Sequence, residues 1–287
     1  MTRREFTRSL SGTALGLSAL TAAGGEAEAA FRNRKKPVAL QLYTVRELAS
    51  KDFTGTLEKV AKIGYDGVEF AGYGGLSSKE MKQRLKDMGL KCAGTHEGFE
   101  RLEKNLGEVI DYNREIGNTF LVCPSMPGEW REKGADGFRA FGERMNLIGE
   151  KVKKAGMRLC YHNHSFEFER FGKKTGLELF YEAAGRNVLA EIDTYWVQHG
   201  GGDPADWCAR LRDRMVVVHL KDMVIAEGQQ AMAEVGEGNL NWPRIIDACR
   251  AAGVQWYAVE QDVCRRDPFD SLAISLRHLR AWGIEDR

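Results

Sequence analysis

The sequence predicts a single (β/α)8 barrel, the TIM-barrel fold, over residues 37–287. A helical stretch, a glycine and a short apolar run that ends in polar residues recur along the chain, as in "VKKAGMRLCYHNH". The recurrence gives eight strand-and-helix units. Continuous apolar runs indicate parallel strands that are buried on both faces. Eight such units in a chain of this length favour a closed barrel over an open doubly wound sheet.

The apolar runs place the strands in order along the chain. We expect strands to begin near Val38, Gly67, Lys91, Thr119, Met157, Val188, Met215 and Tyr257. Several runs follow a glycine that marks the end of the preceding helix, where a left-handed backbone conformation favours this residue. These glycines are Gly64, Gly89, Gly117, Gly156 and Gly253. No Gly-x-Gly-x-x-Gly follows the first strand, which argues against a dinucleotide-binding sheet.

The N-terminal segment has the features of an export signal. Arg3 and Arg4 are paired, Phe6 follows, and a mildly apolar, uncharged stretch leads to small residues. This pattern predicts a twin-arginine signal over residues 1–30 and a periplasmic location. The stretch over 9–23 is too short and too rich in Ser and Gly to span a bilayer. We therefore expect no stable membrane insertion once the signal is removed.

The charge balance limits the classes of binding partner, and the cysteine spacing indicates the state of the thiols. The chain has 42 basic and 41 acidic residues, and no long basic run follows Lys36. A nucleic-acid partner is therefore not expected, whereas a small sugar or keto-sugar substrate fits. The six cysteines form no Cys-x-x-Cys motif, and those at 92, 123 and 160 fall in expected strands, which is typical of small buried thiols. Homo-oligomerisation is compatible with the sequence.

Nearly every expected strand ends in ionisable or strongly polar residues. These residues are Gln41, Tyr43, Glu69, His96, Glu97, His162, His164, Glu167, Asp193, His219, Lys221, Asp222, Glu260 and Asp262. In a (β/α)8 barrel the catalytic groups lie at the C-terminal ends of the strands, so these side chains should meet in one mouth. Burying so many charges together is costly unless something pairs with them. A divalent cation would do so.

The residue types narrow the choice of metal. Carboxylates mixed with imidazoles, without thiolates, suit manganese, magnesium, cobalt, iron or zinc at an open site. We expect Asp193, His219 and Glu260 as ligands, because each follows a different late strand.

The fourth ligand should come from the fifth strand, which ends in "YHNHSFEFE". Side chains alternate along a strand, so His162 and His164 point the same way. We predict Glu167 as the ligand and His164 as the acid or base. The alternative makes His162 the ligand.

Other strand-end residues are assigned to the substrate. His162 and Glu69 are further candidate proton carriers, and Lys221 is placed to hold a developing oxyanion. We expect Gln41, Tyr43, His96 and Trp196 to bind the substrate. For the aromatic residues among them, ordinary packing is an equally good interpretation.

The ordered motifs "GVEFAGYGG", "YHNHSFEFE", "EIDTYWV", "VVVHLKD", "EVGEGNLNW" and "YAVEQD" resemble the sugar phosphate isomerase/epimerase family of xylose isomerase-like TIM barrels. The resemblance covers residues 37–284. It implies a Glu, Asp, His, Glu metal set on strands five to eight, and Asp193, His219 and Glu260 match it. The Glu of strand eight also acts as a base in such relatives. The sequence departs from the pattern at strand five, where His162 stands in place of the Glu.

The resemblance implies a sugar isomerase or epimerase that abstracts a proton next to a carbonyl through a metal-stabilised enediolate. The closer likeness is to relatives that share "YHNH", some of which act on 3-keto-glycosides. A 3-keto-glycoside lyase or hydrolase is therefore the alternative. A non-catalytic sugar-binding protein is a remoter one. A metal-dependent abasic-site endonuclease shares the barrel but needs more histidines than the six present.

Overall fold

The computed structural model describes residues 36–284 and contains a closed barrel of eight parallel strands, in the order β1-β12-β9-β8-β5-β4-β3-β2. The strands are β1 (Val38–Gln41), β2 (Gly67–Phe70), β3 (Lys91–His96), β4 (Phe120–Cys123), β5 (Arg158–His162), β8 (Val188–Asp193), β9 (Met215–Leu220) and β12 (Trp256–Val259). Each begins within one residue of the predicted start. The fold prediction is therefore confirmed. The predicted export signal lies outside the described residues and stays a prediction.

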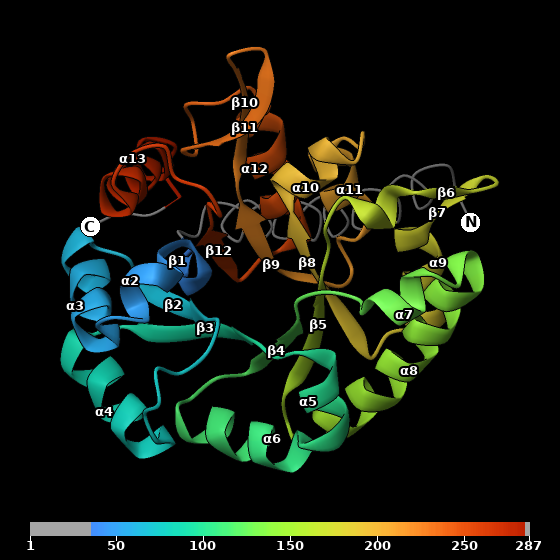
Figure 1. The fold of residues 1–287 in the computed structure, drawn as a ribbon, viewed down its shortest axis with the longest axis horizontal. Coiled ribbons are helices and arrows are strands. Elements are labelled where there is room, and N and C mark those ends of the chain that lie inside the picture. The colour runs from blue at the N-terminus through green and yellow to red at the C-terminus, as the bar shows by residue number, and fades with distance from the viewer. Residues whose placement is uncertain (1–35, 285–287) are drawn as a thin grey trace, which may run out of the picture. The chain divides into compact units, whose positions relative to one another are not determined.

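Helices surround the strands (Figure 1). They are α2 (Arg46–Ala49), α3 (Phe53–Ile63), α4 (Ser78–Met88), α5 (Phe99–Lys104), α6 (Leu106–Glu115), α7 (Gly128–Arg131), α8 (Gly134–Lys154), α9 (Gly176–Ala184), α10 (Thr194–His199), α11 (Pro204–Arg210), α12 (Trp242–Ala252) and α13 (Pro268–Ala281). The Asp52 carboxylate caps α3 by accepting from the Gly55 amide, and the helix ends at Gly64, whose φ is +110°. All five glycines singled out in the sequence have positive φ. Local sequence thus sets where these helices stop.

Strand alternation separates two layers inside the barrel. Ala39, Cys160, Val217 and Ala258 belong to one small apolar cluster of buried side chains. Two residues further along each strand, side chains of the same orientation are polar: Gln41, His162, His219 and Glu260. The apolar layer closes the barrel interior below, and the polar layer lies towards the C-terminal ends of the strands.

Several irregular segments follow the strands. The 3-10 turns are η1 (Leu42–Val45) and η2 (Phe166–Phe168), and the hairpins are β6 (Arg170–Phe171) with β7 (Lys174–Thr175) and β10 (Asp222–Ala226) with β11 (Gln229–Ala233). The β10–β11 hairpin projects from the barrel (Figure 1) and was not expected from the sequence. Asp222 is a structural residue, because its carboxylate accepts from the Gly236 and Gly238 amides in the following loop.

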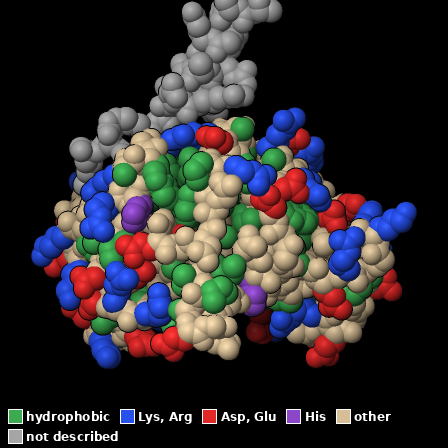
Figure 2. Space-filling model, turned by 90° about the horizontal axis from the view of Figure 1, so that it is seen from above, with side chains coloured by type: hydrophobic (Ala, Val, Ile, Leu, Met, Phe, Trp, Pro, Cys, Tyr) green, Lys and Arg blue, Asp and Glu red, His purple; other side chains and the backbone are tan. Residues whose placement is uncertain are grey.

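The surface shows the mixed charge that the composition predicts. Figure 2 shows acidic and basic side chains interspersed over the face in view, without a broad patch of one sign among the described residues. Within residues 36–284 we find no helix with the length and apolar character needed to cross a membrane.

Candidate active site

A cavity of about 410 Å³ opens where the barrel strands end. Most of the predicted site residues line it: Tyr43, His96, His162, His164, Trp196, Lys221 and Glu260. Arg46 and Asp262 line it as well. The cavity therefore lies at the C-terminal end of the barrel, where the polar layer meets solvent.

Four side chains form what we call the mouth group: His162, Asp193, His219 and Glu260. Each offers one ligand atom, and these atoms lie within 4.8 Å of one another. His162 Nε2 is 3.4 Å from Asp193 Oδ2, and His219 Nδ1 is 3.0 Å from Glu260 Oε2. All four residues are buried. The structure thus brings three of the predicted ligands together, with His162 from strand β5.

Lys221 already supplies a positive charge to the mouth group. Its Nζ lies 2.7 Å from Glu260 Oε2, 3.1 Å from Asp193 Oδ2 and 3.0 Å from Asp262 Oδ1. Burial disfavours the ammonium, but these carboxylates outweigh it and raise the pKa of Lys221. In return, Lys221 lowers the pKa of Asp193 although burial opposes this.

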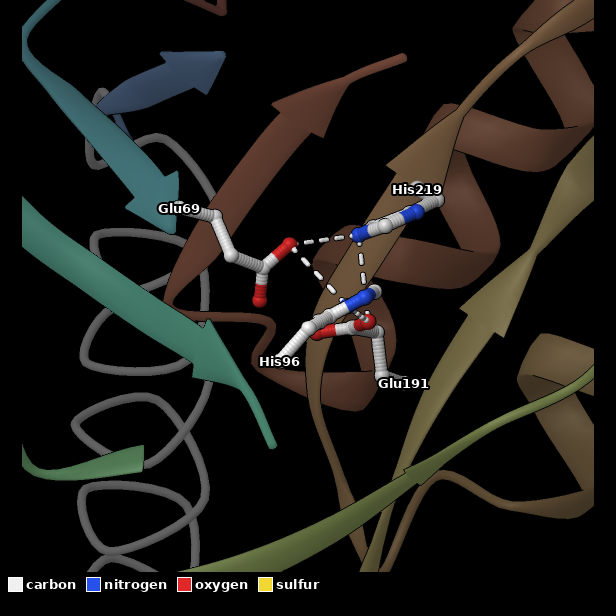
Figure 3. A group of neighbouring side chains, drawn as sticks. All are labelled: Glu69, His96, Glu191 and His219. Carbon is white, nitrogen blue, oxygen red and sulfur yellow. Dashed lines mark hydrogen bonds and ion pairs between the residues drawn. The ribbon is translucent and has the colours of Figure 1, made fainter. Parts of the chain in front are cut away.

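A second set of side chains lies beside the first, and we call it the inner group: Glu69, His96, Glu191 and His219 (Figure 3). His219 Nε2 is 2.6 Å from Glu69 Oε2 and 3.1 Å from Glu191 Oε1, while His96 Nε2 is 2.8 Å from Glu191 Oε1. His219 therefore belongs to both groups and uses a different ring nitrogen in each. Glu69 and Glu191 do not line the cavity.

The two inner carboxylates differ in charge. Burial, followed by repulsion from Glu191, raises the pKa of Glu69 to about 7. Burial also opposes ionisation of Glu191, but His219 and His96 hold its pKa well below the usual range. Glu69 Oε1 and Glu191 Oε2 are buried and have no hydrogen-bond partner within residues 36–284. Two acceptor oxygens of the inner group are thus unused by the described side chains.

Comparisons with known proteins agree with the barrel fold. The family model for xylose isomerase-like TIM barrels matches residues 57–282. The chain belongs to this family. Its relatives include the rhizopine catabolism protein MocC of Rhizobium meliloti, which is 23% identical over 241 residues that cover 72% of this chain and 73% of that protein.

The chain is also similar to two proteins whose names state an enzymatic activity. The inosose dehydratase of Geobacillus kaustophilus (strain HTA426) is 22% identical over 189 residues, or 58% of this chain and 61% of the dehydratase. The crystal structure of a sugar phosphate isomerase/epimerase from Parabacteroides distasonis superposes with a TM-score of 0.73 at 28% identity. That match covers 88% of this chain and 96% of the other. This xylose isomerase-like barrel is thus similar to isomerase/epimerase and dehydratase proteins, so an enzyme is expected.

Glu167, the predicted strand-five ligand of this xylose isomerase-like barrel, lies outside both groups. The η2 turn directs its carboxylate to the Tyr161 hydroxyl at 2.7 Å and to the His164 amide at 2.9 Å. Burial raises the pKa of Glu167 to about 7. The expected position of Glu167 is therefore corrected: it supports the loop after β5, and His162 takes the place in the mouth group.

His164 lies at the cavity wall with one free nitrogen. Its ring is 4.9 Å from that of His162 and 5.3 Å from that of Trp196, centre to centre. His164 Nδ1 has no hydrogen-bond partner. Burial and the charge of His162 lower the pKa of His164 to about 3. The imidazole is therefore neutral near pH 7.

The two predicted substrate-binding residues after β1 differ in exposure. Gln41 is fully buried, and its amide group donates to Glu69 Oε2 at 3.0 Å and accepts from the Tyr43 amide. It supports Glu69 and does not line the cavity, which corrects its expected place. Tyr43 is 45% exposed at the rim, with the Arg46 guanidinium 4.4 Å above its ring.

Sequence reasoning missed Glu191. This residue stands two positions before Asp193 in "EID", so both side chains point to the same side of strand β8. That spacing was the available signal. The strand-end position of Asp193 does not by itself reveal Glu191.

Proposed function

We propose that the protein is a divalent-metal-dependent sugar isomerase or epimerase that removes a proton next to a carbonyl group of its substrate. The observation that carries the proposal is the mouth group, where Asp193, His219 and Glu260 meet His162 beside a cavity. His164 lines the same cavity, although its unpaired Nδ1 is buried. Two of the candidate cation ligands, His162 and Glu260, and the imidazole of His164 thus border one small-molecule space.

The donors fit a divalent cation. Two carboxylates and two imidazoles, with no thiolate among them, suit manganese, magnesium, cobalt, iron or zinc. The mouth group would hold the ion, because it borders the cavity that a substrate must enter. When bound there, a divalent cation polarises a carbonyl oxygen and stabilises the negative charge that develops on it.

The side chains of the chain itself supply the proton transfer. His164 presents the lone pair of a neutral imidazole, so it can accept the proton next to the carbonyl. The electrons of the C–H bond then form the enediolate. Return of the proton to the same carbon from the opposite face gives epimerisation, and its return to the former carbonyl carbon, with a proton passing between the two oxygens, gives isomerisation. Lys221 lines the cavity with its three donors facing carboxylates, and a cation that binds Asp193 and Glu260 would release donors to hydrogen-bond a substrate oxygen. Glu260 is the family's second candidate base.

A β-elimination is the second candidate reaction, and similarity to the inosose dehydratase favours it. It begins with the same proton abstraction. The electrons then form a carbon–carbon double bond and expel a β-hydroxyl as water or a glycosidic oxygen as the aglycone. A 3-keto-glycoside would be a substrate of this kind.

Solvent exchange tests the proposal. Protein loaded with Mn²⁺ is incubated in D₂O with ketoses, inososes and 3-keto-glycosides, and deuterium in the recovered substrate is measured. We expect uptake next to the carbonyl with the wild type, little with His164→Gln, and none after removal of metal by a chelator. His278→Gln, on α13 and outside the cavity lining, is the matched control and should exchange normally.

The products separate the candidates, because isomerisation conserves mass whereas elimination loses water or an aglycone. Sugar binding without exchange or turnover by any of these substrates would indicate a non-catalytic binding protein and overturn the proposal. Exchange that survives metal removal would contradict metal dependence.

A further inference from the structure

We propose that the inner group positions His219 for the cation and is not a second cation site. In this arrangement Glu69 and Glu191 hold the His219 Nε2–H, which leaves the Nδ1 lone pair for the mouth group. His96 in turn holds Glu191. The inference rests on the proposed function, because it assumes that a cation binds the mouth group.

The two ring nitrogens of His219 contact different carboxylates. Its Nε2 meets Glu69 Oε2 at 2.6 Å and Glu191 Oε1 at 3.1 Å, and its Nδ1 meets Glu260 Oε2 at 3.0 Å. A neutral imidazole has one N–H and one lone pair, so it cannot bind two cations through both nitrogens. Carboxylates face both nitrogens, so a cation that takes the Nδ1 lone pair leaves the remaining proton on Nε2, where Glu69 and Glu191 accept it. Metal-binding histidines generally donate their other N–H to such an oriented partner.

Further contacts fix the inner carboxylates. Glu69 Oε2 also accepts from the Gln41 amide at 3.0 Å. Glu191 Oε1 is 2.8 Å from His96 Nε2. The His96 and His219 rings stack with centres 5.4 Å apart and planes inclined by 7°. These contacts hold both the direction of the hydrogen bond and the plane of the ring.

Glycine at position 94 makes room for this arrangement. A Cβ at this position would lie 2.6 Å from Glu69 Oε1, closer than the two atoms can approach. Glu69 Oε1 and Glu191 Oε2 remain unpartnered, whereas the oxygens that face His219 are already engaged. A cation bound in the inner group through His219 Nε2 or His96 Nε2 would have to displace those engaged contacts. If the inner group instead positions His219, the contacts between its carboxylates and the imidazole remain as they are.

The test measures binding of Mn²⁺ alone by equilibrium dialysis. We expect one equivalent per wild-type chain. Glu69→Gln and Glu191→Gln should each weaken the affinity by roughly 10–100-fold, the usual effect of losing a residue that orients a metal ligand, and keep one equivalent. Glu234→Gln changes a buried carboxylate that contacts Ser271 and Arg266 instead, and should bind Mn²⁺ like the wild type.

A fallback variant and an NMR measurement distinguish positioning of His219 from a purely structural role. If Glu191→Gln does not fold, His96→Asn removes the donor to Glu191 from a partly exposed position and should still weaken binding. In Zn²⁺-loaded protein, nitrogen NMR of His219 should show the proton on Nε2, and Glu69→Gln should shift that signal. A purely structural role would change stability without moving the NMR signal.

Three outcomes would overturn the inference. Two equivalents of Mn²⁺ in the wild type and one in Glu191→Gln would make the inner group a second site. Unchanged affinity in both glutamine variants would remove the positioning role while leaving the proposed function intact. Failure of the wild type to bind Mn²⁺, Zn²⁺ or any other divalent ion would overturn both proposals.

Discussion

The mouth group and the inner group have similar donors but balance their charges differently. In the mouth group an ammonium, Lys221, contacts two of the ligand carboxylates and Asp262. In the inner group Glu69 and Glu191 face the imidazoles of His96 and His219, and Glu69 also accepts from the neutral Gln41 amide. His162 and Glu260 of the mouth group border the cavity, as does His96 of the inner group, whereas neither inner carboxylate does. Under the proposed function, a cation that enters the mouth group would take over the positive charge that Lys221 supplies, and the inner group has no ammonium to replace.

Loss of His219 should have the largest effect, because this residue alone belongs to both groups. His219→Ala should abolish metal binding and activity and also lower stability by about 3–5 kcal/mol, since it leaves buried carboxylates uncompensated. Asp193→Ala and Glu260→Ala should lose metal and activity with a smaller loss of stability. Metal analysis, turnover assays and denaturant titration measure the three quantities. Full metal occupancy in all three variants would place the ion elsewhere.

His164→Gln should separate proton transfer from metal binding within the mouth. We expect kcat to fall by ~10²-fold or more, the scale of general acid–base catalysis, with unchanged metal content. Because the pKa of His164 is about 3, its protonation should not lower the activity of the wild type between pH 5 and 8. Steady-state rates across this range check both statements. Metal loss in His164→Gln would instead make His164 a ligand.

Lys221→Met tests whether the ammonium competes with the metal. Without metal, the variant should be about 3 kcal/mol less stable, because Asp193 and Glu260 lose their buried partner. Addition of Mn²⁺ should raise its melting temperature more than that of the wild type, because the ion no longer displaces an ammonium. Thermal unfolding with and without Mn²⁺ measures the difference. An equal rise in both proteins would mean that Lys221 and the cation do not share the carboxylates.

Glu167→Gln should have the smallest effect, because Glu167 lies outside both groups. Its pKa is raised to about 7 in the folded protein, so the folded state binds this proton more tightly than the unfolded state. The free energy of unfolding of the wild type should therefore fall by on the order of 1–3 kcal/mol as the pH rises from about 4.5 through 7. The glutamine variant should lack this decline and keep its metal. Urea titrations at pH 5 and pH 8 test the slope, and metal loss would restore Glu167 as a ligand.

The sequence by itself determined the strands, the glycines that end helices, and the presence of acids and histidines at the strand ends. These features are local: apolar runs, backbone conformation and alternation along one strand act over a few residues. Alternation alone put His162 and His164 on the same side of the fifth strand. It also contained the clue to Glu191, two positions before Asp193.

Only the tertiary structure decided which of these side chains meet. His219 and Glu69 lie 150 positions apart in the chain, yet their side chains are 2.6 Å apart. Barrel closure and the stagger between strands set this contact, and neither is encoded in the pattern of a single strand. The η2 turn likewise directs Glu167 away from the cavity to Tyr161. Local patterns thus fix which residues face inward, whereas the register between distant strands decides their partners.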